Sequence, residues 1–347
     1  MKKEELVDFF AQLGKVCAQL GKGEEWSDFS LGVTKEEYEK LQYVVNRQFV
    51  YNGWFSKENV QKSLFDWSVL LRDEKITDWL KGYSFNSSPK KVSIIMAGNI
   101  PMVGFHDFAS VILSGNIAVC KLSSEDNTII PALLDMMVSW NPDFANHFLL
   151  TAGKMGKVDA IIATGSNNSV QHFDQYFGHL PHIFRKNRVS IAVLDGNETD
   201  EEMEALGDDI FTYFGLGCRN VSHLLLPEGY KIDKFFEGIF KHKDIVYNKK
   251  YGNNYDYNKA IFLMNKHALL DNNFVLLKET EDLHSPLAMV YHHTYKNQDE
   301  IDKYLNAHQK DIQVVIGHNY MPFGQAQTPS WTDYADNVDS MKWLGNI

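Results

Sequence analysis

Hydrophobic positions near the start of the chain recur at the three- to four-residue spacing of an amphipathic helix. The apolar positions of this stretch are Leu6, Phe9, Phe10, Leu13, Val16, Cys17 and Leu20. A second helix start is indicated by Thr34, which is followed by Glu36, Glu37 and Glu39. We expect residues 1–85 to be helical, with their many aromatic side chains packed in a core rather than lining a substrate channel.

From residue 91 onward, short apolar runs alternate with polar turns and helical stretches. The runs that predict strands cover residues 92–97, 116–120, 158–163 and 189–194, and the helices between them cover 106–113, 127–140 and 169–176. Strand, polar loop and helix in repeated order predict a parallel, doubly wound sheet. Such sheets bind ligands at the carboxyl ends of their strands, and here those ends carry Asn99, Lys121 and Ser166.

A second alternation of the same kind begins near residue 197. It predicts helices over 198–214, 231–240 and 298–307 and strands over 221–226, 287–291 and 312–316. The segment 241–258 is rich in Tyr, Asn and Lys, and we expect it to be an exposed loop. The fold class that follows is α/β, with two doubly wound domains and a helical N-terminal lead-in.

Composition and charge narrow the class of protein. The chain has 347 residues, 44% of them hydrophobic, which suits a folded enzyme of two domains. Its formal net charge of -11 disfavours nucleic acid as a partner, since phosphate binding needs a basic surplus. The N-terminus, MKKEELVDFF, has acids where a signal peptide needs an apolar run, and we expect no transmembrane segment. Three sparse cysteines indicate a reducing, cytoplasmic setting without a disulfide framework.

Cys218 is the first candidate for chemistry. It lies between Gly217 and a predicted strand, and two nearby glycines let the backbone approach a ligand closely. Arg219 is adjacent and could favour a thiolate, although a lone cysteine is more often buried and inert. Cys17 and Cys120 lie on apolar faces of predicted elements, and we interpret both as core residues.

Asn99 is the second candidate, because a strand-end amide can donate to an oxyanion. The alternative is an Asn that serves the turn before Pro101. The glycine fingerprints of dinucleotide- and phosphate-binding loops are both missing. His292 and His293 are adjacent in a predicted strand, so they face opposite sides and form a poor metal pair. We expect no metal site.

Taken together and in order, these motifs resemble the aldehyde dehydrogenase superfamily, and most closely its LuxC-type acyl-CoA reductases. The matching stretches are Ala97-Gly98-Asn99-Ile100-Pro101, Ala118-Val119-Cys120-Lys121-Leu122-Ser123, Thr164-Gly165-Ser166 and Gly215-Leu216-Gly217-Cys218. A fifth stretch, Pro322-Phe323-Gly324-Gln325-Ala326 followed by Trp331 and Asp333, resembles the C-terminal signature of the acyl-CoA reductase branch. The resemblance covers about residues 90–347.

The resemblance implies roles for individual residues. Cys218 would be the covalent nucleophile, and Asn99 would form the oxyanion hole with the backbone N–H of Cys218. Lys121 would contact the adenosine ribose of a nicotinamide cofactor. Gly165 and Ser166 would lie near its nicotinamide and diphosphate.

Departures from the superfamily pattern bear on the cofactor, on hydrolysis of the acyl-enzyme and on oligomerisation. Ser123 and Ser124 would also bind the cofactor. Ser124 stands three residues after Lys121, where NAD-using relatives often carry a Glu, which favours NADPH, with NADH still possible, although Glu125 is next to it. The stretch 182–188 holds no carboxylate at the place of the water-activating Glu of hydrolytic members. Asp282 aligns loosely with a ribose-binding Glu, and the usual oligomerisation hairpin is not found.

The residue pattern and the resemblance together predict four parts of the chain: a helical lead-in at 1–85 packed on the cofactor domain, an NAD(P)-binding domain at 86–196, a catalytic domain at 197–318, and a return to the cofactor domain at 319–347. The implied reaction takes a fatty acyl-CoA to the aldehyde through an acyl-Cys thioester, with coenzyme A as the carrier that leaves. The many aromatic residues would suit a roomy apolar pocket and hence a long acyl chain. The implied partners are an acyl-thioester substrate and either a second copy of the chain or an acyl-transferring protein. Alternatives are a CoA-acylating aldehyde dehydrogenase, an acyl-phosphate reductase, and an inactive nucleotide-binding relative.

Overall fold

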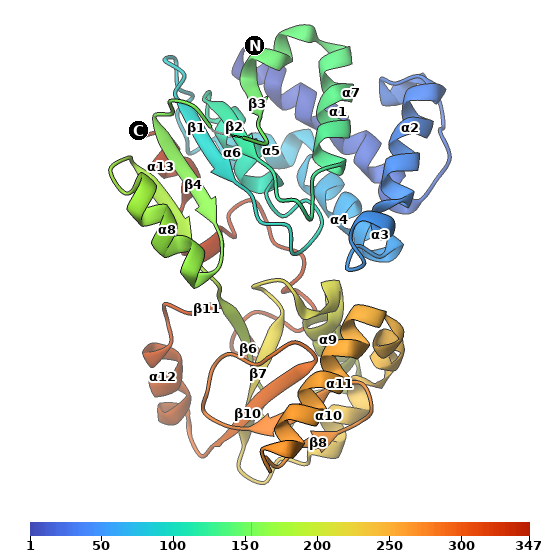
Figure 1. The fold of residues 1–347 in the computed structure, drawn as a ribbon, viewed down its shortest axis with the longest axis vertical. Helices are drawn as coiled ribbons and strands as arrows, with labels where there is room; N and C mark the ends of the chain where they lie inside the picture. Colours follow the sequence, from blue (N-terminus) through green and yellow to red (C-terminus); the bar gives the residue numbers. More distant parts are fainter. Residues whose placement is uncertain (154) are drawn as a thin grey trace. The chain divides into compact units, whose positions relative to one another are not determined.

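The computed structural model describes residues 1–153 and 155–347 and divides into two compact units (Figure 1). The first unit contains residues 1–186 and 330–347, and the second contains residues 187–329. The chain therefore passes into the second unit about ten residues earlier than the pattern predicts, and leaves it about ten residues later.

The lead-in is helical, as the spacing of apolar residues predicts. Its elements are α1 (Lys3–Lys22), η1 (Phe29–Leu31), α2 (Lys35–Asn46), α3 (Gln48–Tyr51), α4 (Lys57–Leu70) and α5 (Asp73–Leu80). Thr34 begins α2 with a capping box, in which its side chain and that of Glu37 each satisfy a backbone N–H of the other residue. Helices α1 and α4 cross closely at Gly21, where any Cβ would lie 2.5 Å from the backbone nitrogen of Phe65.

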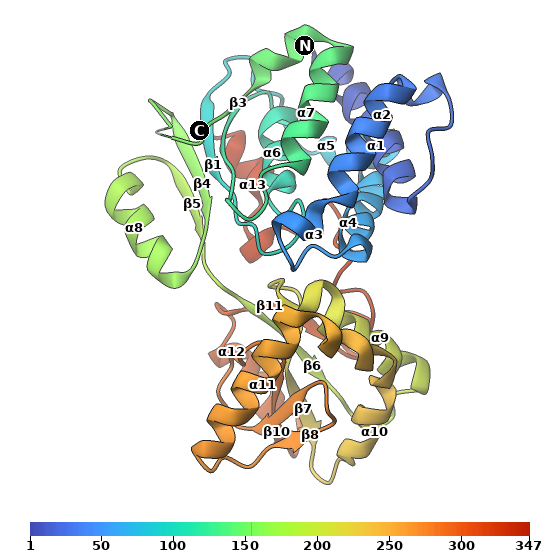
Figure 2. The ribbon, with the colours of Figure 1, turned by 45° about the vertical axis from the view of Figure 1, so that its right-hand side comes forward.

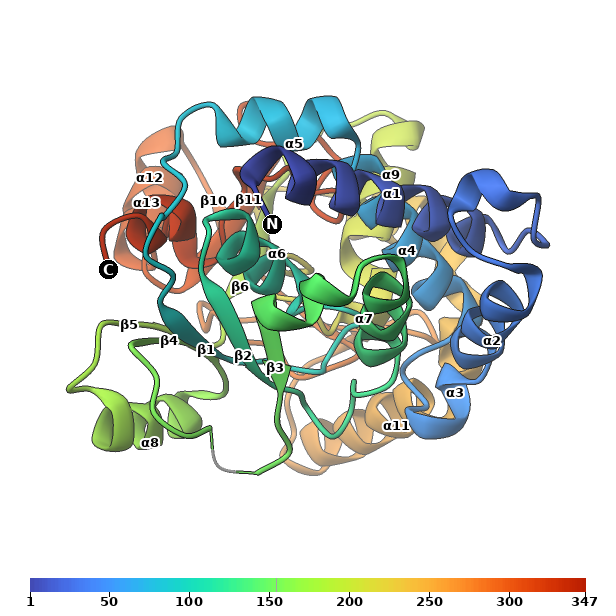
Figure 3. The ribbon, with the colours of Figure 1, turned by 90° about the horizontal axis from the view of Figure 1, so that it is seen from above.

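The first sheet is entirely parallel and has the strand order β3-β2-β1-β4-β5. Its strands are β1 (Lys91–Ile95), β2 (Ile117–Lys121), β3 (Phe148–Leu150), β4 (Ala160–Thr164) and β5 (His182–Arg185). The connecting elements are α6 (Phe105–Leu113), α7 (Ile129–Trp140), η2 (Pro142–His147) and α8 (Asn167–Phe177). Figures 2 and 3 show α6 and the N-terminal helices on one face of this sheet and α8 on the other, which is the doubly wound arrangement.

The C-terminal residues complete the first unit. They form η5 (Ala335–Asn337) and α13 (Ser340–Leu344), and α13 packs against α6. Trp331 stacks on Trp79 with ring centroids 4.2 Å apart, and its indole donates to the carbonyl of Leu70. The hydroxyl of Tyr334 accepts from the Trp79 indole at 2.8 Å. These contacts join both ends of the chain in one hydrophobic core.

The second sheet has the order β11-β6-β7-β10-β9-β8, with β8 antiparallel and the others parallel. Its strands are β6 (Val189–Val193), β7 (Val221–Pro227), β8 (Leu270–Asp271), β9 (Leu276–Glu279), β10 (Met289–Tyr295) and β11 (Ile312–Ile316). Its helical elements are α9 (Asp200–Phe211), η3 (Thr212–Gly215), α10 (Ile232–Gly238), η4 (Phe240–Tyr247), α11 (Lys249–Met264) and α12 (Gln298–Ala307). The α/β class with two doubly wound sheets is confirmed.

Three sequence interpretations need correction. The strand at 189–193 belongs to the second sheet, and the first sheet is instead completed by β3 and β5, which the pattern missed because both are short. The expected loop at 241–258 is wrong, since it holds η4 and most of α11. Asn248 caps α11. The buried face of this helix consists of Tyr251, Tyr255 and Asn258 rather than aliphatic residues. That polar composition concealed the helical period.

Helix length and hydropathy bear on the membrane question. Among the described residues, no helix combines the length and the apolar character needed to cross a bilayer.

Candidate functional site

The carboxyl edge of the first sheet brings together the loops that follow β1 and β2. Ile95 pairs with Lys121, and the backbone N–H of Met96 donates to the Lys121 carbonyl at 3.0 Å. Gly98 lies against the next loop, because any Cβ there would come within 2.5 Å of the Ser123 hydroxyl. The side chain of Asn99 is exposed beside this contact. Only glycine at position 98 permits so close an approach of the two loops.

The β2 loop presents a cation beside two hydroxyls. Lys121 is exposed, and its ammonium has no hydrogen-bond or ion-pair partner among residues 1–153 and 155–347. Ser123 closes the turn by accepting from the backbone N–H of Glu125 at 3.2 Å, while Ser124 is exposed at its tip. The loop is held from behind, where Asn52 donates to the Glu125 carbonyl. It is therefore a fixed, solvent-facing turn.

The loop after β4 lies at the same edge of the first sheet. Gly165 donates its N–H to the carbonyl of Arg185, and any Cβ at Gly165 would lie 2.7 Å from the Ser169 Cβ. Glycine is therefore required at position 165 for packing alone, because β4 and α8 approach each other closely there. Ser166 is exposed and caps α8 by accepting from the Ser169 N–H at 3.2 Å.

These residues fit a nicotinamide dinucleotide in chemical type. A lysine ammonium and serine hydroxyls suit ribose and phosphate oxygens, and the N-terminus of α8 presents backbone N–H groups that favour an anion. Lys121, Ser123, Ser124, Gly165 and Ser166 all belong to this one edge, so the structure places six of the eight predicted residues together when Asn99 is counted.

Cys218 and Asp282 lie in the second unit. Each precedes a strand, β7 and β10 respectively, and these two strands are hydrogen-bonded neighbours. Asp282 is exposed, and its carbonyl lies 3.1 Å from Nδ1 of His223. Its carboxylate therefore faces solvent from a loop whose backbone is anchored to β7.

Cys218 is exposed at the tip of a turn that begins with a strained backbone. Tyr213, Phe214 and Gly215 have φ values of 55°, 59° and 77°, so three successive residues occupy the left-handed region. Two of them carry bulky side chains, for which this conformation costs about 1 kcal/mol or more each. Such strain persists only where the surroundings hold it, and it clusters at functional sites.

Asn220 supplies much of that hold. It is buried, and its amide nitrogen lies 2.8–3.2 Å from the carbonyls of Asp209, Ile210 and Thr212. Its amide oxygen accepts from the N–H of Gly217 at 2.8 Å. One side chain thus ends α9 and closes the turn. Asn220 is not among the residues predicted from the sequence, although an Asn directly before a strand and after a Gly-rich turn is a recognisable turn signal.

The segment with the Pro322–Ala326 motif also holds the turn. Arg219 donates its Nε–H to the carbonyl of Ala326, so the guanidinium is directed at this segment. On the other side, the Ser190 hydroxyl donates to the Cys218 carbonyl at 3.0 Å. The motif that resembles the acyl-CoA reductase signature is therefore, in this chain, a support for the cysteine turn.

A cavity of about 250 Å³ lies directly behind the turn, within the second unit. Most of its lining residues are of apolar type, among them Phe214, Leu216, Val221, Tyr251, Leu287 and Met289, while Ser222 and Ser285 add polar groups. Leu216 and Val221 flank the tip that carries Cys218. An apolar pocket against a thiol-bearing turn is suited to the hydrocarbon part of an acyl group.

The other two cysteines differ from Cys218 in their surroundings. Cys17 and Cys120 are buried, as predicted. Burial raises the pKa of the Cys17 thiol to about 12, and it also raises the pKa of Cys120. Both stay protonated thiols at neutral pH and are inert as nucleophiles.

Solved structures with similar folds are aldehyde dehydrogenases. An NAD-dependent aldehyde dehydrogenase from Sinorhizobium meliloti superposes with a TM-score of 0.62 at 14% identity, over 88% of this chain and 68% of that one. A Mycobacterium tuberculosis aldehyde dehydrogenase complexed with NAD+ gives 0.62 at 11% identity, over 88% and 71%. The aldehyde dehydrogenase KauB from Pseudomonas aeruginosa gives 0.64 at 12% identity, over 91% and 72%. The fold is that of the aldehyde dehydrogenase superfamily.

Comparison with known sequences identifies the family within this superfamily. No curated protein sequence matches the chain significantly. The model of the acyl-CoA reductase (LuxC) family, however, matches residues 16–235, which is more than half of the chain. The chain belongs to the LuxC family of acyl-CoA reductases, as its motifs predict, and is an NAD(P)-dependent oxidoreductase that acts on acyl or aldehyde groups.

Proposed function

We propose that this protein reduces a fatty acyl-CoA to the aldehyde with NADPH, through an acyl thioester on Cys218. The observation that carries the proposal is the exposed Cys218 on a strained and heavily supported turn, with an apolar cavity directly behind it. A structural cysteine would not need this support, and the two structural cysteines of the chain are buried.

The chemistry proceeds by exchange of one thioester for another. The Cys218 sulfur, as thiolate, attacks the acyl carbonyl carbon; the bond to the coenzyme A sulfur breaks, and coenzyme A leaves as a thiolate. Asn99 and the backbone N–H of Cys218 are expected to hold the oxyanion, as the resemblance implies. Reduced nicotinamide, when bound, supplies the hydride that brings the acyl group to the aldehyde level. Cleavage of the carbon–sulfur bond then releases the aldehyde and restores Cys218.

The preference for NADPH rests on the turn after β2. Ser124 is exposed where NAD-using relatives often carry a Glu, so the position itself presents no carboxylate to a 2'-phosphate. Lys121 adds an exposed positive charge three residues earlier. The neighbouring Glu125 has its backbone N–H and carbonyl both engaged in hydrogen bonds, which fixes its place in the turn.

Water must be kept from the acyl-enzyme if aldehyde is the product. The stretch 182–188 contains no carboxylate that could activate water. Its first half forms β5, where Arg185 is buried in an ion pair with Asp107. This segment therefore supplies no carboxylate base, which favours reduction of the acyl group over hydrolysis.

The size of the cavity bears on the acyl chain. A cavity of about 250 Å³ has room for an acyl chain of limited length. A longer chain would extend beyond this pocket. We therefore include medium-chain as well as long-chain acyl-CoAs in the proposed substrate range.

The test is to mix purified protein with NADPH and acyl-CoAs of short, medium and long chain, and to follow loss of nicotinamide absorbance. A Cys218→Ala variant serves as the control. We expect oxidation of NADPH that depends on Cys218, with one aldehyde and one coenzyme A formed per turnover. No turnover with any acyl-CoA and either cofactor would refute the proposed activity.

A further inference from the structure

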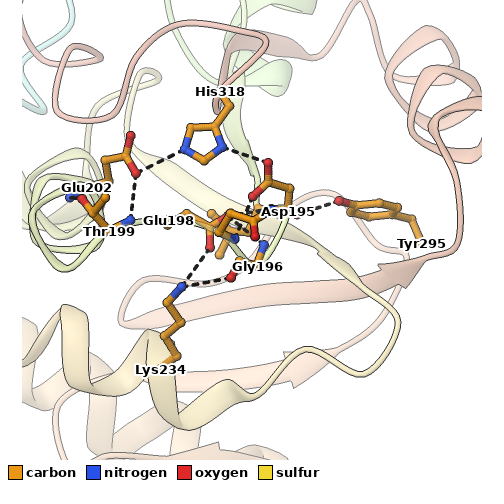
Figure 4. Close-up of polar contacts among 10 residues, drawn as sticks. Asp195, Gly196, Glu198, Thr199, Glu202, Lys234, Tyr295 and His318 are labelled. Atoms are coloured by element: carbon orange, nitrogen blue, oxygen red, sulfur yellow. Dashed lines mark hydrogen bonds and ion pairs between the residues drawn. The ribbon is translucent and has the colours of Figure 1, made fainter.

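The segment 318–327, called the strap below, runs along α9 and is held by hydrogen bonds at both ends. At its start, the imidazole of His318 lies between two carboxylates, 2.8 Å from Asp195 and 3.2 Å from Glu202 (Figure 4). In its middle, Gly324 touches α9, with any Cβ only 3.0 Å from that of Ala205. At its end, Ala326 accepts from Arg219, which neighbours Cys218.

Asp209 also binds the strap near its end, through its carboxylate. Its side chain is fully buried near the C-terminus of α9. Oδ2 accepts from the N–H of Gly324 at 2.6 Å, and Oδ1 accepts from the N–H of Ala326 at 2.9 Å. Its backbone carbonyl lies 3.1 Å from the Asn220 amide nitrogen and 3.3 Å from that of Gln327.

One residue therefore binds both the strap and the cysteine turn. The strap is attached through the carboxylate, and the turn is attached through the carbonyl by way of Asn220, which also binds Gly217. From the geometry we infer that Asp209 is a positioning residue, whose ionised carboxylate fixes the strap and the Arg219–Asn220 turn so that Cys218 is held in place for attack. This inference rests on the proposed function of Cys218.

The inference requires an ionised carboxylate and not merely a polar group. Two backbone donors approach two different oxygens, and only a carboxylate offers two acceptors. An amide, or a protonated carboxyl group, would turn one of these oxygens into a donor facing another donor. Asparagine at position 209 therefore imitates the protonated aspartic acid, while its volume is unchanged.

Protonation should consequently release the strap in the mildly acidic range. Burial raises the pKa of Asp209 to about 6, against the lowering effect of the two N–H donors. The charged groups that act on it are Asp208 from α9, which raises the pKa, and Arg219 from the cysteine turn, which lowers it. The strap itself contributes the two neutral N–H groups.

The experiment compares Asp209→Asn with Asp208→Asn in the whole 347-residue chain. Asp208 is the adjacent residue, but its carboxylate is half exposed and pairs with Lys241 and His242 at the surface, away from the strap. Two quantities are measured from pH 5 to 8: the rate of Cys218 alkylation by iodoacetamide, located by mass spectrometry, and kcat with KM for acyl-CoA and NADPH.

For Asp209→Asn we expect kcat to fall about 10- to 100-fold, the scale of a small misplacement of a reacting group, with both KM values little changed. We expect wild type to lose kcat and to change alkylation rate as pH falls through about 6. Asp208→Asn should show the same transition at a lower pH, because it lacks the neighbouring charge that raises the pKa of Asp209, and Asp209→Asn should lack the transition. Wild-type kcat in Asp209→Asn, or the same transition in all three proteins, overturns the inference.

A second variant and a readout that does not depend on activity cover the cases in which the first comparison fails. If Asp209→Asn does not fold, Gly324→Ala lifts the strap at a residue with φ of 79° and should lower kcat in the same way, without changing any charge. If wild type reduces no acyl-CoA, the proposed function has failed. The alkylation profiles then still decide whether Asp209 controls Cys218.

Discussion

The side-chain oxygen of Asn220 accepts a hydrogen bond from the backbone N–H of Gly217 at 2.8 Å, which closes the two-residue turn of Cys218 and Arg219. The same amide donates to carbonyls at the end of α9. The position of the thiol is thus determined by a side chain outside the reacting group.

Replacing Asn220 with Ala should destabilise the second unit. Several buried carbonyls and one N–H lose their partner at once, and we expect a loss of about 2–4 kcal/mol in the free energy of unfolding. Urea denaturation measures it. Asn220→Asp keeps the acceptor for Gly217 but loses the donors, so its loss should also be large; a near-neutral Ala variant would contradict the assigned role.

Replacing Cys218 with Ala should abolish the covalent acyl-enzyme and leave the fold intact, because the side chain is exposed. Intact-protein mass spectrometry after incubation with acyl-CoA, without reductant, should show one added acyl group on wild type and none on the variant. Cys120→Ala is the matched control and should still be acylated. Acylation of the Cys218→Ala protein would exclude this residue as the nucleophile.

Replacing Ser124 with Glu should shift cofactor preference from NADPH toward NADH. A carboxylate at the tip of this turn would repel a 2'-phosphate, and we expect the ratio of kcat/KM for NADPH over NADH to drop about tenfold or more. Steady-state kinetics with both cofactors measures the ratio. Ser124→Gln, of similar size but uncharged, separates repulsion from crowding: it should leave the ratio near that of wild type.

Replacing Leu287 with Trp should shorten the acyl chain that the enzyme accepts. Leu287 lines the cavity behind the cysteine turn, and a larger ring there would fill part of its volume of about 250 Å³. We expect activity with medium- and long-chain acyl-CoAs to fall at least tenfold relative to a two- or four-carbon substrate. An unchanged chain-length profile would show that acyl chains bind elsewhere.

Stability should depend on His318 in alkaline solution. Hydrogen bonds to Asp195 and Glu202 raise its pKa to about 9, above the ordinary 6.5. Because the folded pKa is the higher one, the stabilisation is complete below about pH 6.5 and is lost as pH rises through about 9. The melting temperature of wild type should fall across this window more steeply than that of His318→Gln. Parallel profiles for the two proteins would argue against the assigned pairing.

The periodic parts of the fold could be predicted from the sequence, and the cysteine site only in part. Helix α12 and strand β11 follow clear apolar patterns, and the predicted ranges 298–307 and 312–316 agree with the observed ones. The three-residue β3 carries too few positions to show a period. Helix α11 was missed because its buried face is aromatic and amide, and these residues are also common in loops.

The residues that hold the Cys218 turn in place could not be predicted from the sequence, for a different reason. Asp209 lies in an acidic helix, where nothing in the pattern separates it from its exposed neighbour Asp208. What distinguishes Asp209 is contact with residues more than one hundred positions later in the chain. A motif can show that residues 322–326 matter, but only the fold shows what they hold.

The order of the two units along the chain has a consequence for biosynthesis. The second unit is one continuous segment inserted into the first, whose core needs Trp331 and α13. During translation, the inserted unit is therefore complete and able to fold while the first still lacks its final segment. Until residues 330–347 leave the ribosome, Trp79 and α6 lack the partners that pack on them, so the first unit is the later of the two to complete its core.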